Sequence, residues 1–222
     1  MGEVKILFEI PLFGYNIGIT ESIVIQWFIM IFLIVFSILL TRNLKKEPDK
    51  KQTVLEMFVN TVNKVVRENM GESYLGFVPF IGTLVLFILL MNIFGLFGLE
   101  PPTREYPITI GLASITFVII QVYAIKKHGL LGYFAGYTKP IIPLLPINIM
   151  ERIMLPVSLS LRLYGNILAG AVIMELVYES LGKFALAIPV PLHFYFDLFD
   201  GTIQMVIFVM LTMVNIKLIA EH

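Results

Sequence analysis

Five long apolar runs divide the sequence, and each is long enough to cross a lipid bilayer as a helix. Such a helix needs about 20 mostly apolar residues. The predicted membrane helices cover residues 22–41, 74–98, 106–125, 148–178 and 190–219. Residues 53–70 differ, because apolar side chains recur there at helical spacing among charged ones, which predicts an amphipathic helix at the cytoplasmic membrane interface. The pattern predicts an all-α, polytopic membrane protein with a single domain over residues 1–222 and two long helices at its end.

The composition agrees with a membrane protein. Of the 222 residues, 58% are hydrophobic and 14% are charged, whereas soluble domains carry about 25% charged residues. There are no cysteines, which excludes disulfides, thiolate metal sites and cysteine nucleophiles. A net charge of zero gives no indication of nucleic acid as a partner. We expect no cleavable signal peptide, because the first residues lack the required apolar stretch and cleavage site.

The positions of the basic residues predict the orientation. Residues 42–51, after the first span, contain two arginine or lysine clusters, and Lys126 and Lys127 follow the third span. The loop after the second span has few basic residues. Because short loops rich in lysine and arginine stay in the cytoplasm, we expect the N-terminus outside, the C-terminus inside, and a bacterial plasma membrane as the location.

Arg162 lies within the fourth predicted span. Placing a guanidinium at the centre of a membrane helix costs from about 2.5 kcal/mol on insertion scales to about 10 kcal/mol or more in simulations. Ser158, Gly165, Asn166 and Ala169 share its helix face and are small or modest in size. Two interpretations follow: the face packs inside the bundle with Arg162 paired to an acid, or the cation belongs to an ion pathway.

The fifth predicted span carries a polar stripe at helical spacing. Its members are His193, Asp197, Asp200, Gln204, Leu211 and Asn215. Intramembrane acids often mark ion pathways, but acids also favour the first turn of a helix. Both interpretations stay open for Asp200. For Asp197 the pathway is favoured, because it lies one turn from His193 and on the stripe of Gln204.

The segment 156–170, PVSLSLRLYGNILAG, resembles the hallmark of subunit a of the rotary F-type ATP synthase. Residues 91–103 resemble the end of that family's second long helix and its exit loop. Residues 146–151 resemble the start of the arginine helix, and Gln204 together with the C-terminal tail resembles the last helix. The resemblance extends from about residue 75 onward, in consistent order and spacing.

This resemblance implies a stator subunit that lies against a rotating ring of c subunits. Two aqueous half-channels, one open to each side, lead protons or Na⁺ to and from the carboxylates of the ring. The implied partners are the c ring, the peripheral-stalk b subunits, the other ATP synthase subunits, the lipid bilayer and the transported ion. The resemblance implies no cofactor and no catalysis by this chain alone.

By matching positions, the resemblance makes Arg162 the essential arginine between the half-channels. Asn166 is its neighbour one turn on, and Gln204 is the glutamine that faces it. Glu151 is a candidate for the inner side.

The sequence departs from the family pattern at Ala171, where many relatives have glutamate or histidine. Glu175 lies one turn further on the same face and is a candidate substitute. We therefore predict that Asp197, with Glu175 and His193, lines the outward half-channel.

Two other functions of membrane proteins require features of their own. A secondary transporter is expected to show internal repeats or broken helices, and an intramembrane enzyme needs a nucleophile with a base. The sequence shows neither. It leaves open whether the transported ion is H⁺ or Na⁺.

Overall fold

The computed structural model describes residues 6–12, 15–97, 101–137, 142–181 and 189–221. Five helical stretches in these ranges are long and apolar enough to cross a membrane, which confirms the predicted fold class. They contain α1 (Glu21–Thr41), α3 (Val78–Ile93), α4 (Tyr106–Gly136), α5 (Leu145–Leu181) and α7 (Gly201–Glu221).

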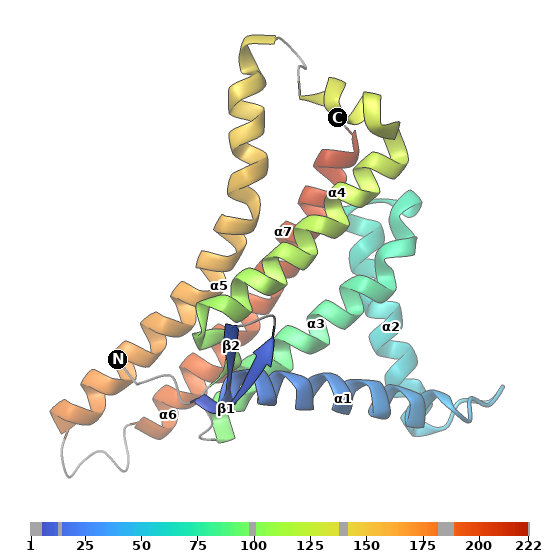
Figure 1. Cartoon of the computed structure of the whole chain (residues 1–222). Helices are drawn as coiled ribbons and strands as arrows, with labels where there is room; N and C mark the ends of the chain where they lie inside the picture. The colour runs from blue at the N-terminus through green and yellow to red at the C-terminus, as the bar shows by residue number, and fades with distance from the viewer. Residues whose placement is uncertain (1–5, 13–14, 98–100, 138–141, 182–188, 222) are drawn as a thin grey trace.

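Helix α7 is the centre of the bundle. It packs against α3, α4 and α5, while α1 crosses these helices and contacts α3 (Figure 1). Half of the last span is buried inside the protein, against 6% of α1. Uniformly apolar helices carry no amphipathic pattern that selects a buried face, so packing decides which residues lie inside.

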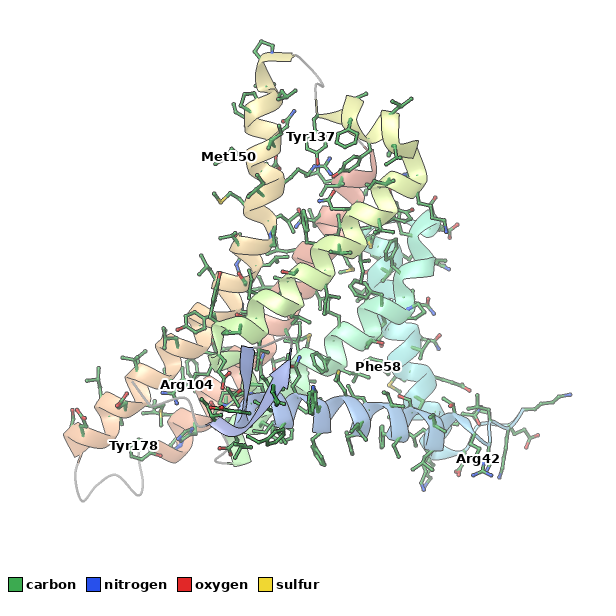
Figure 2. The ribbon with its side chains drawn as sticks, in the orientation of Figure 1. Arg42, Phe58, Arg104, Tyr137, Met150 and Tyr178 are labelled. Atoms are coloured by element: carbon green, nitrogen blue, oxygen red, sulfur yellow. The ribbon has the colours of Figure 1, made fainter. Side chains whose placement is uncertain are left out.

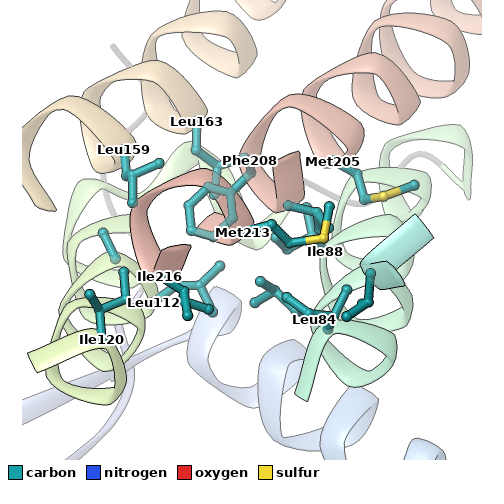
Figure 3. Close-up of a cluster of buried hydrophobic side chains, with 14 of the residues drawn as sticks. Leu84, Ile88, Leu112, Ile120, Leu159, Leu163, Met205, Phe208, Met213 and Ile216 are labelled. Carbon is teal, nitrogen blue, oxygen red and sulfur yellow. The ribbon is translucent and has the colours of Figure 1, made fainter. Parts of the chain in front are cut away.

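The core is formed by side chains that α7 places against its neighbours (Figure 3). Phe208, Met213 and Ile216 of α7 are at most 1% exposed. They belong to one buried cluster with Ile88 of α3, Ile120 of α4, and Leu159 and Leu163 of α5. This cluster fixes the separation of α5 and α7, the two helices that carry the functional site.

Helix α4 extends beyond the predicted end at residue 125. Lys126, Lys127 and His128 continue the helix, and the break comes at Gly129, whose φ of 73° lies in the left-handed region that favours glycine. The following turns point in a new direction, back toward α5 (Figure 1). A basic pair ends a membrane span by its charge, but it does not end a helix.

Helix α5 is also longer than predicted and bends along its length (Figure 1). Pro156 lies inside it, where a proline removes one backbone hydrogen bond and clashes with the preceding turn. Before the bend α5 runs beside α4, and after the bend it runs beside the last helix.

The last helix contains a change of winding. A short helix α6 (Pro189–His193) leads into a π-helical segment, Phe194–Asp200, before α7. Asn92 of α3 lies beside the end of this segment and is 1% exposed. Its amide donates to the carbonyl oxygen of Gly201 at 2.9 Å and accepts a bond from the Thr103 hydroxyl at 3.2 Å. The side chain therefore ties α3 and its following loop to the last helix.

The sequence did not predict a hairpin that precedes α1. Strands β1 (Ile6–Leu12) and β2 (Tyr15–Thr20) pair antiparallel. In β2 apolar and small or polar residues alternate, as is typical of a strand, but the run is too short to stand out beside the long spans. The Thr20 hydroxyl donates to the Glu105 carboxylate at 2.9 Å and so connects the start of α1 to the start of α4.

The amphipathic helix is α2 (Lys50–Asn69), which packs on α3 through the buried side chains of Val62 and Val66. Val54 and Met57, 66% and 63% exposed, point away from that contact. The location of α2 at a membrane interface stays a prediction, as does the single-domain organisation.

We expect Asn92→Leu to lower the thermal stability of the protein in detergent micelles. Leucine is similar in size, but it leaves the Thr103 hydroxyl and the Gly201 carbonyl without their partner, and a buried polar group without a partner costs about 1–3 kcal/mol. The control is Thr83→Val, which removes an exposed bond to the Pro79 carbonyl (2.8 Å). Equal midpoints of thermal unfolding for the two variants would contradict the role of Asn92.

Candidate functional site

Helices α5 and α7 are joined by a bond between two amide side chains. Asn166 Nδ2 donates to Gln204 Oε1 at 2.8 Å. Gln204 is 1% exposed, and its Nε2 atom is buried without a hydrogen-bond partner among the described residues. This pair lies between two cavities.

The first cavity, here called the arginine cavity, has a volume of about 430 Å³. It is bounded by α5, by the last turns of α7 and by the bent end of α4. Its polar and charged lining residues are Tyr137, Asn148, Glu151, Arg152, Ser158, Arg162 and Asn215.

The second cavity, here called the acidic cavity, has a volume of about 580 Å³. It lies between the C-terminal half of α5, the π-helical segment and the loop before α4. Its charged and polar lining residues are Arg104, Asn166, Glu175, Tyr178, Glu179, His193, Asp197 and Asp200.

No residue lines both cavities within the described ranges. On α5 the change from one to the other falls between Arg162 and Asn166, which are one helical turn apart. On the last helix it falls between Asp200 and Leu211, where Gln204 lies. Tyr137 and Tyr178, one from each cavity, lie toward opposite ends of α5 (Figure 2). Along α5 and the last helix, the Asn166–Gln204 contact thus lies where the lining changes from one cavity to the other.

Arg162 has no hydrogen-bond or ion-pair partner in the part of the chain that the structure describes. Its side chain is exposed, as are Ser158, Gly165 and Ala169 on the same helix face. The interpretation in which Arg162 pairs with an acid inside the bundle is therefore wrong for these residues. A permanent cation is therefore exposed among small side chains.

In the acidic cavity a chain of hydrogen bonds connects α5 to the π-helical segment. The Tyr178 hydroxyl lies 3.1 Å from His193 Nε2, and His193 Nδ1 lies 2.9 Å from Asp197 Oδ2. In the tautomer with its proton on Nδ1, the imidazole donates to the carboxylate and Nε2 accepts from the tyrosine hydroxyl. Three groups that can exchange protons are therefore in contact along the wall of the cavity.

The Asp197 carboxylate rests against the backbone of Gly95. An ideal Cβ atom on Gly95 would lie 2.8 Å from Asp197 Cγ, so any side chain there would displace the carboxylate. Glycine is needed at this position for the close approach.

The predicted site residues separate between the two cavities. Asn166, Glu175, His193, Asp197 and Asp200 line the acidic cavity. Glu151 and Arg162 line the arginine cavity, and Gln204 bonds to Asn166. Ala171, where the sequence departs from the family pattern, lines the acidic cavity together with Glu175.

The helix-start interpretation of the two acids is wrong. The described helix begins at Pro189, so Asp197 and Asp200 lie beyond its first turn, where the helix dipole has little effect.

Several lining residues were not predicted. Tyr178 follows Glu175 at the spacing of one helix face and was detectable from that spacing. Arg104 and Arg152 were not, because their positions depend on the loop before α4 and on the bend at Gly129. No three His, Asp or Glu side chains in the described ranges come close enough together to hold a metal ion.

Comparison with known proteins identifies similar sequences along most of the chain. The family model described as ATP synthase A chain matches residues 23–217. The chain is 33% identical over 219 residues to "ATP synthase subunit a, sodium ion specific" of Propionigenium modestum, covering 91% of this chain and 75% of that protein. It is 34% identical over 201 residues to "ATP synthase subunit a" of Moorella thermoacetica, covering 90% of each. It is 36% identical over 221 residues to "ATP synthase subunit a" of Staphylococcus saprophyticus, covering 91% of each.

We expect alanine substitutions at two glycines to have opposite effects on thermal stability. Gly95→Ala forces the Asp197 carboxylate to move, which disturbs its bond to His193, and should destabilise the protein by about 1 kcal/mol. Gly111→Ala adds the same methyl group on α4 with nothing within 4 Å, and it should stabilise the helix by up to about 1 kcal/mol. Thermal unfolding in detergent measures both. A stabilising Gly95→Ala would refute the close packing of Gly95 on Asp197.

Proposed function

Since this chain belongs to the ATP synthase A chain family, we propose that the acidic cavity and the arginine cavity are its two half-channels. The protein is the ion-translocating stator subunit of an F-type ATP synthase, a multi-pass membrane protein, and ATP is made in the F1 sector of the complex. The transporter and enzyme alternatives are therefore wrong. The proposal concerns the path of the ion and the residues that carry it.

The observation that carries the proposal is the unpartnered guanidinium of Arg162 at the boundary between the cavities. A fixed cation on an exposed, small-residue face attracts a carboxylate from another polypeptide. In the assembled enzyme that carboxylate belongs to the ring of c subunits, which lies along this face of α5. At a separation of about 4 Å and an effective dielectric of about 20, the attraction is about 4 kcal/mol.

This attraction determines where a ring carboxylate releases its ion. A ring carboxylate that reaches Arg162 is stabilised in its charged form, so it releases its H⁺ or Na⁺ on arrival. The guanidinium also repels a free cation that would otherwise cross directly from one cavity to the other. Asn166 and Gln204, joined to each other, support the same boundary from α5 and α7.

The acidic cavity is the outward half-channel. Its carboxylates attract cations from the outer solution, and the chain Tyr178–His193–Asp197 offers a connected route toward Asn166. Glu175 takes the place of the acid absent at Ala171, and Asp200 lies on the inner part of the same wall.

The arginine cavity is the inward half-channel, with Glu151 on its α5 wall. The orientation follows from the basic residues. His128, which follows Lys126 and Lys127, lies 2.7 Å from the carbonyl oxygen of Ala220, near the C-terminal end of α7 that lines this cavity. Because basic loops stay in the cytoplasm, this end of the bundle faces the cytoplasm of a bacterial cell and the N-terminus faces outward. The peripheral-stalk b subunits are further partners.

Whether the transported ion is H⁺ or Na⁺ requires a measurement. The relative from Propionigenium modestum is sodium ion specific by name, whereas the names of the relatives from Moorella thermoacetica and Staphylococcus saprophyticus state no ion. ATP-driven pumping by the reconstituted complex, measured with and without Na⁺, distinguishes the two ions.

We expect Arg162→Ala to abolish ATP synthesis driven by an ion gradient. Loss of about 4 kcal/mol of attraction corresponds to a change of about a thousandfold in the equilibrium for ion release. Synthesis in proteoliposomes is the measurement. The control Arg67→Ala removes an exposed arginine that lies 3.8 Å from Glu72 and should leave synthesis unchanged. Synthesis at the rate of the unmodified complex in Arg162→Ala would overturn the proposal.

We expect Asp197→Asn to slow ATP-driven pumping. Asparagine has the same shape and still accepts a bond from His193, but it carries no charge and cannot relay a proton. The matched control Glu72→Gln neutralises an exposed acid outside both cavities. Pumping by Asp197→Asn that equals pumping by the control would remove Asp197 from the path.

A further inference from the structure

A second arginine, Arg152, holds the bent end of α4 against α5. Its guanidinium carbon lies 4.9 Å from the centre of the Tyr137 ring and 5.6 Å from that of Tyr133. Its Nη1 atom donates to Gln121 Oε1 at 3.3 Å. A guanidinium over aromatic faces within about 6 Å is attracted to them, and its planar shape stacks where a lysine does not.

The aromatic rings are themselves fixed in place. The Tyr133 hydroxyl donates to Gln121 Oε1 at 2.6 Å and lies 2.6 Å from the Tyr137 hydroxyl. Asn148 of α5 donates to the backbone oxygen of Tyr137 at 2.8 Å. We call the set Gln121, Tyr133, Tyr137, Asn148 and Arg152 the arginine clamp. It connects α4 on both sides of its bend to the first turns of α5.

The segment that the clamp holds has little other packing. Beyond Gly129, the side chains of Leu130, Leu131 and Phe134 are 64%, 89% and 65% exposed. Gly136 and Tyr137, at the end of the same segment, line the arginine cavity. The position of this cavity wall therefore depends on the clamp more than on apolar contacts of the segment itself.

We propose that Arg152 is a positioning residue of the inward half-channel: by clamping the segment after Gly129 to α5, it keeps the arginine cavity open. The inference rests on the proposed function of that cavity. Without the guanidinium, the released tyrosine rings turn toward the apolar side chains that line the cavity, among them Leu155, Leu159 and Leu211. The cavity then narrows around Glu151 and Asn215, and water no longer reaches these two side chains.

The absence of cysteine from the chain provides a direct test. Asn215→Cys reports access to the arginine cavity, and Ala171→Cys reports access to the acidic cavity. In the assembled complex, the rate of labelling by a charged methanethiosulfonate reagent is measured for each cysteine with and without Arg152→Met. We expect labelling at position 215 to fall at least about fivefold, because Arg152→Met removes two cation–π contacts and the loss of one corresponds to about that factor, while labelling at position 171 stays unchanged.

A second pair of variants approaches the clamp from α4, in case Arg152→Met assembles poorly. Tyr137→Phe keeps the ring face and removes only the hydroxyl, so labelling at position 215 should stay as in the parent. Tyr137→Leu removes the ring and should reduce labelling as Arg152→Met does. This difference would not arise if Tyr137 were needed only for its hydrogen bond to Tyr133.

The outcomes separate the clamp from the proposed path. Unchanged labelling at position 215 in both Arg152→Met and Tyr137→Leu overturns the clamp, as does an equal fall in Tyr137→Phe and Tyr137→Leu. Reduced labelling together with reduced ATP-driven pumping supports the inference in full. Reduced labelling with normal pumping supports the clamp but overturns the assignment of the arginine cavity as the inward half-channel.

Discussion

A permanent cation in an apolar helix bundle needs a counter-charge, and the described part of the chain supplies none for Arg162. A guanidinium stays charged at any physiological pH, so the mismatch is not relieved by loss of a proton. Within the described structure the guanidinium faces the arginine cavity and the exposed face of α5. The fold therefore leaves a fixed positive charge accessible from outside the chain.

The fold also keeps the arginine cavity and the acidic cavity apart. Behind Arg162, the buried side chains of Leu159, Leu163 and Phe208 form an apolar layer between α5 and α7. Asn166 and Gln204 form a polar connection across this layer, and each amide uses it to satisfy part of its hydrogen-bonding capacity. An amide pair exchanges no proton with its surroundings, so it joins the helices without joining the two cavities chemically.

The sequence was sufficient for residues whose role depends on a single helix. Arg162 and Asn166 share a face of α5 that ordinary helical spacing predicts, Glu175 lies one turn from Ala171 in the acidic cavity, and the long apolar spans are visible from composition. Residues whose role depends on where two elements meet were not predictable in this way. Gly95 packs on Asp197 from a distant segment, and Arg152 meets Tyr137 only because α4 bends at Gly129. Helical periodicity contains no information on either contact.

The polar stripe of the last helix shows the same limit in more detail. Uniform helical spacing places His193, Asp197, Asp200 and Gln204 on one face, and the prediction assumed that spacing throughout. The π-helical segment Phe194–Asp200 changes the winding, so the two acids face the acidic cavity while Gln204 is buried against Asn166.

Such a segment disturbs the regular pattern of backbone hydrogen bonds in the helix. The side chain of Asn92 supplies a hydrogen bond at this place. The Asn92 amide donates to the carbonyl of Gly201, at the point where α7 begins. Gly201 permits this approach, because a Cβ atom there would lie 3.0 Å from Asn92 Cβ. The polar stripe of the last helix therefore has two parts: its acids line the acidic cavity, and Gln204 is buried. The change of winding between the two parts is stabilised by α3, which is far away in sequence.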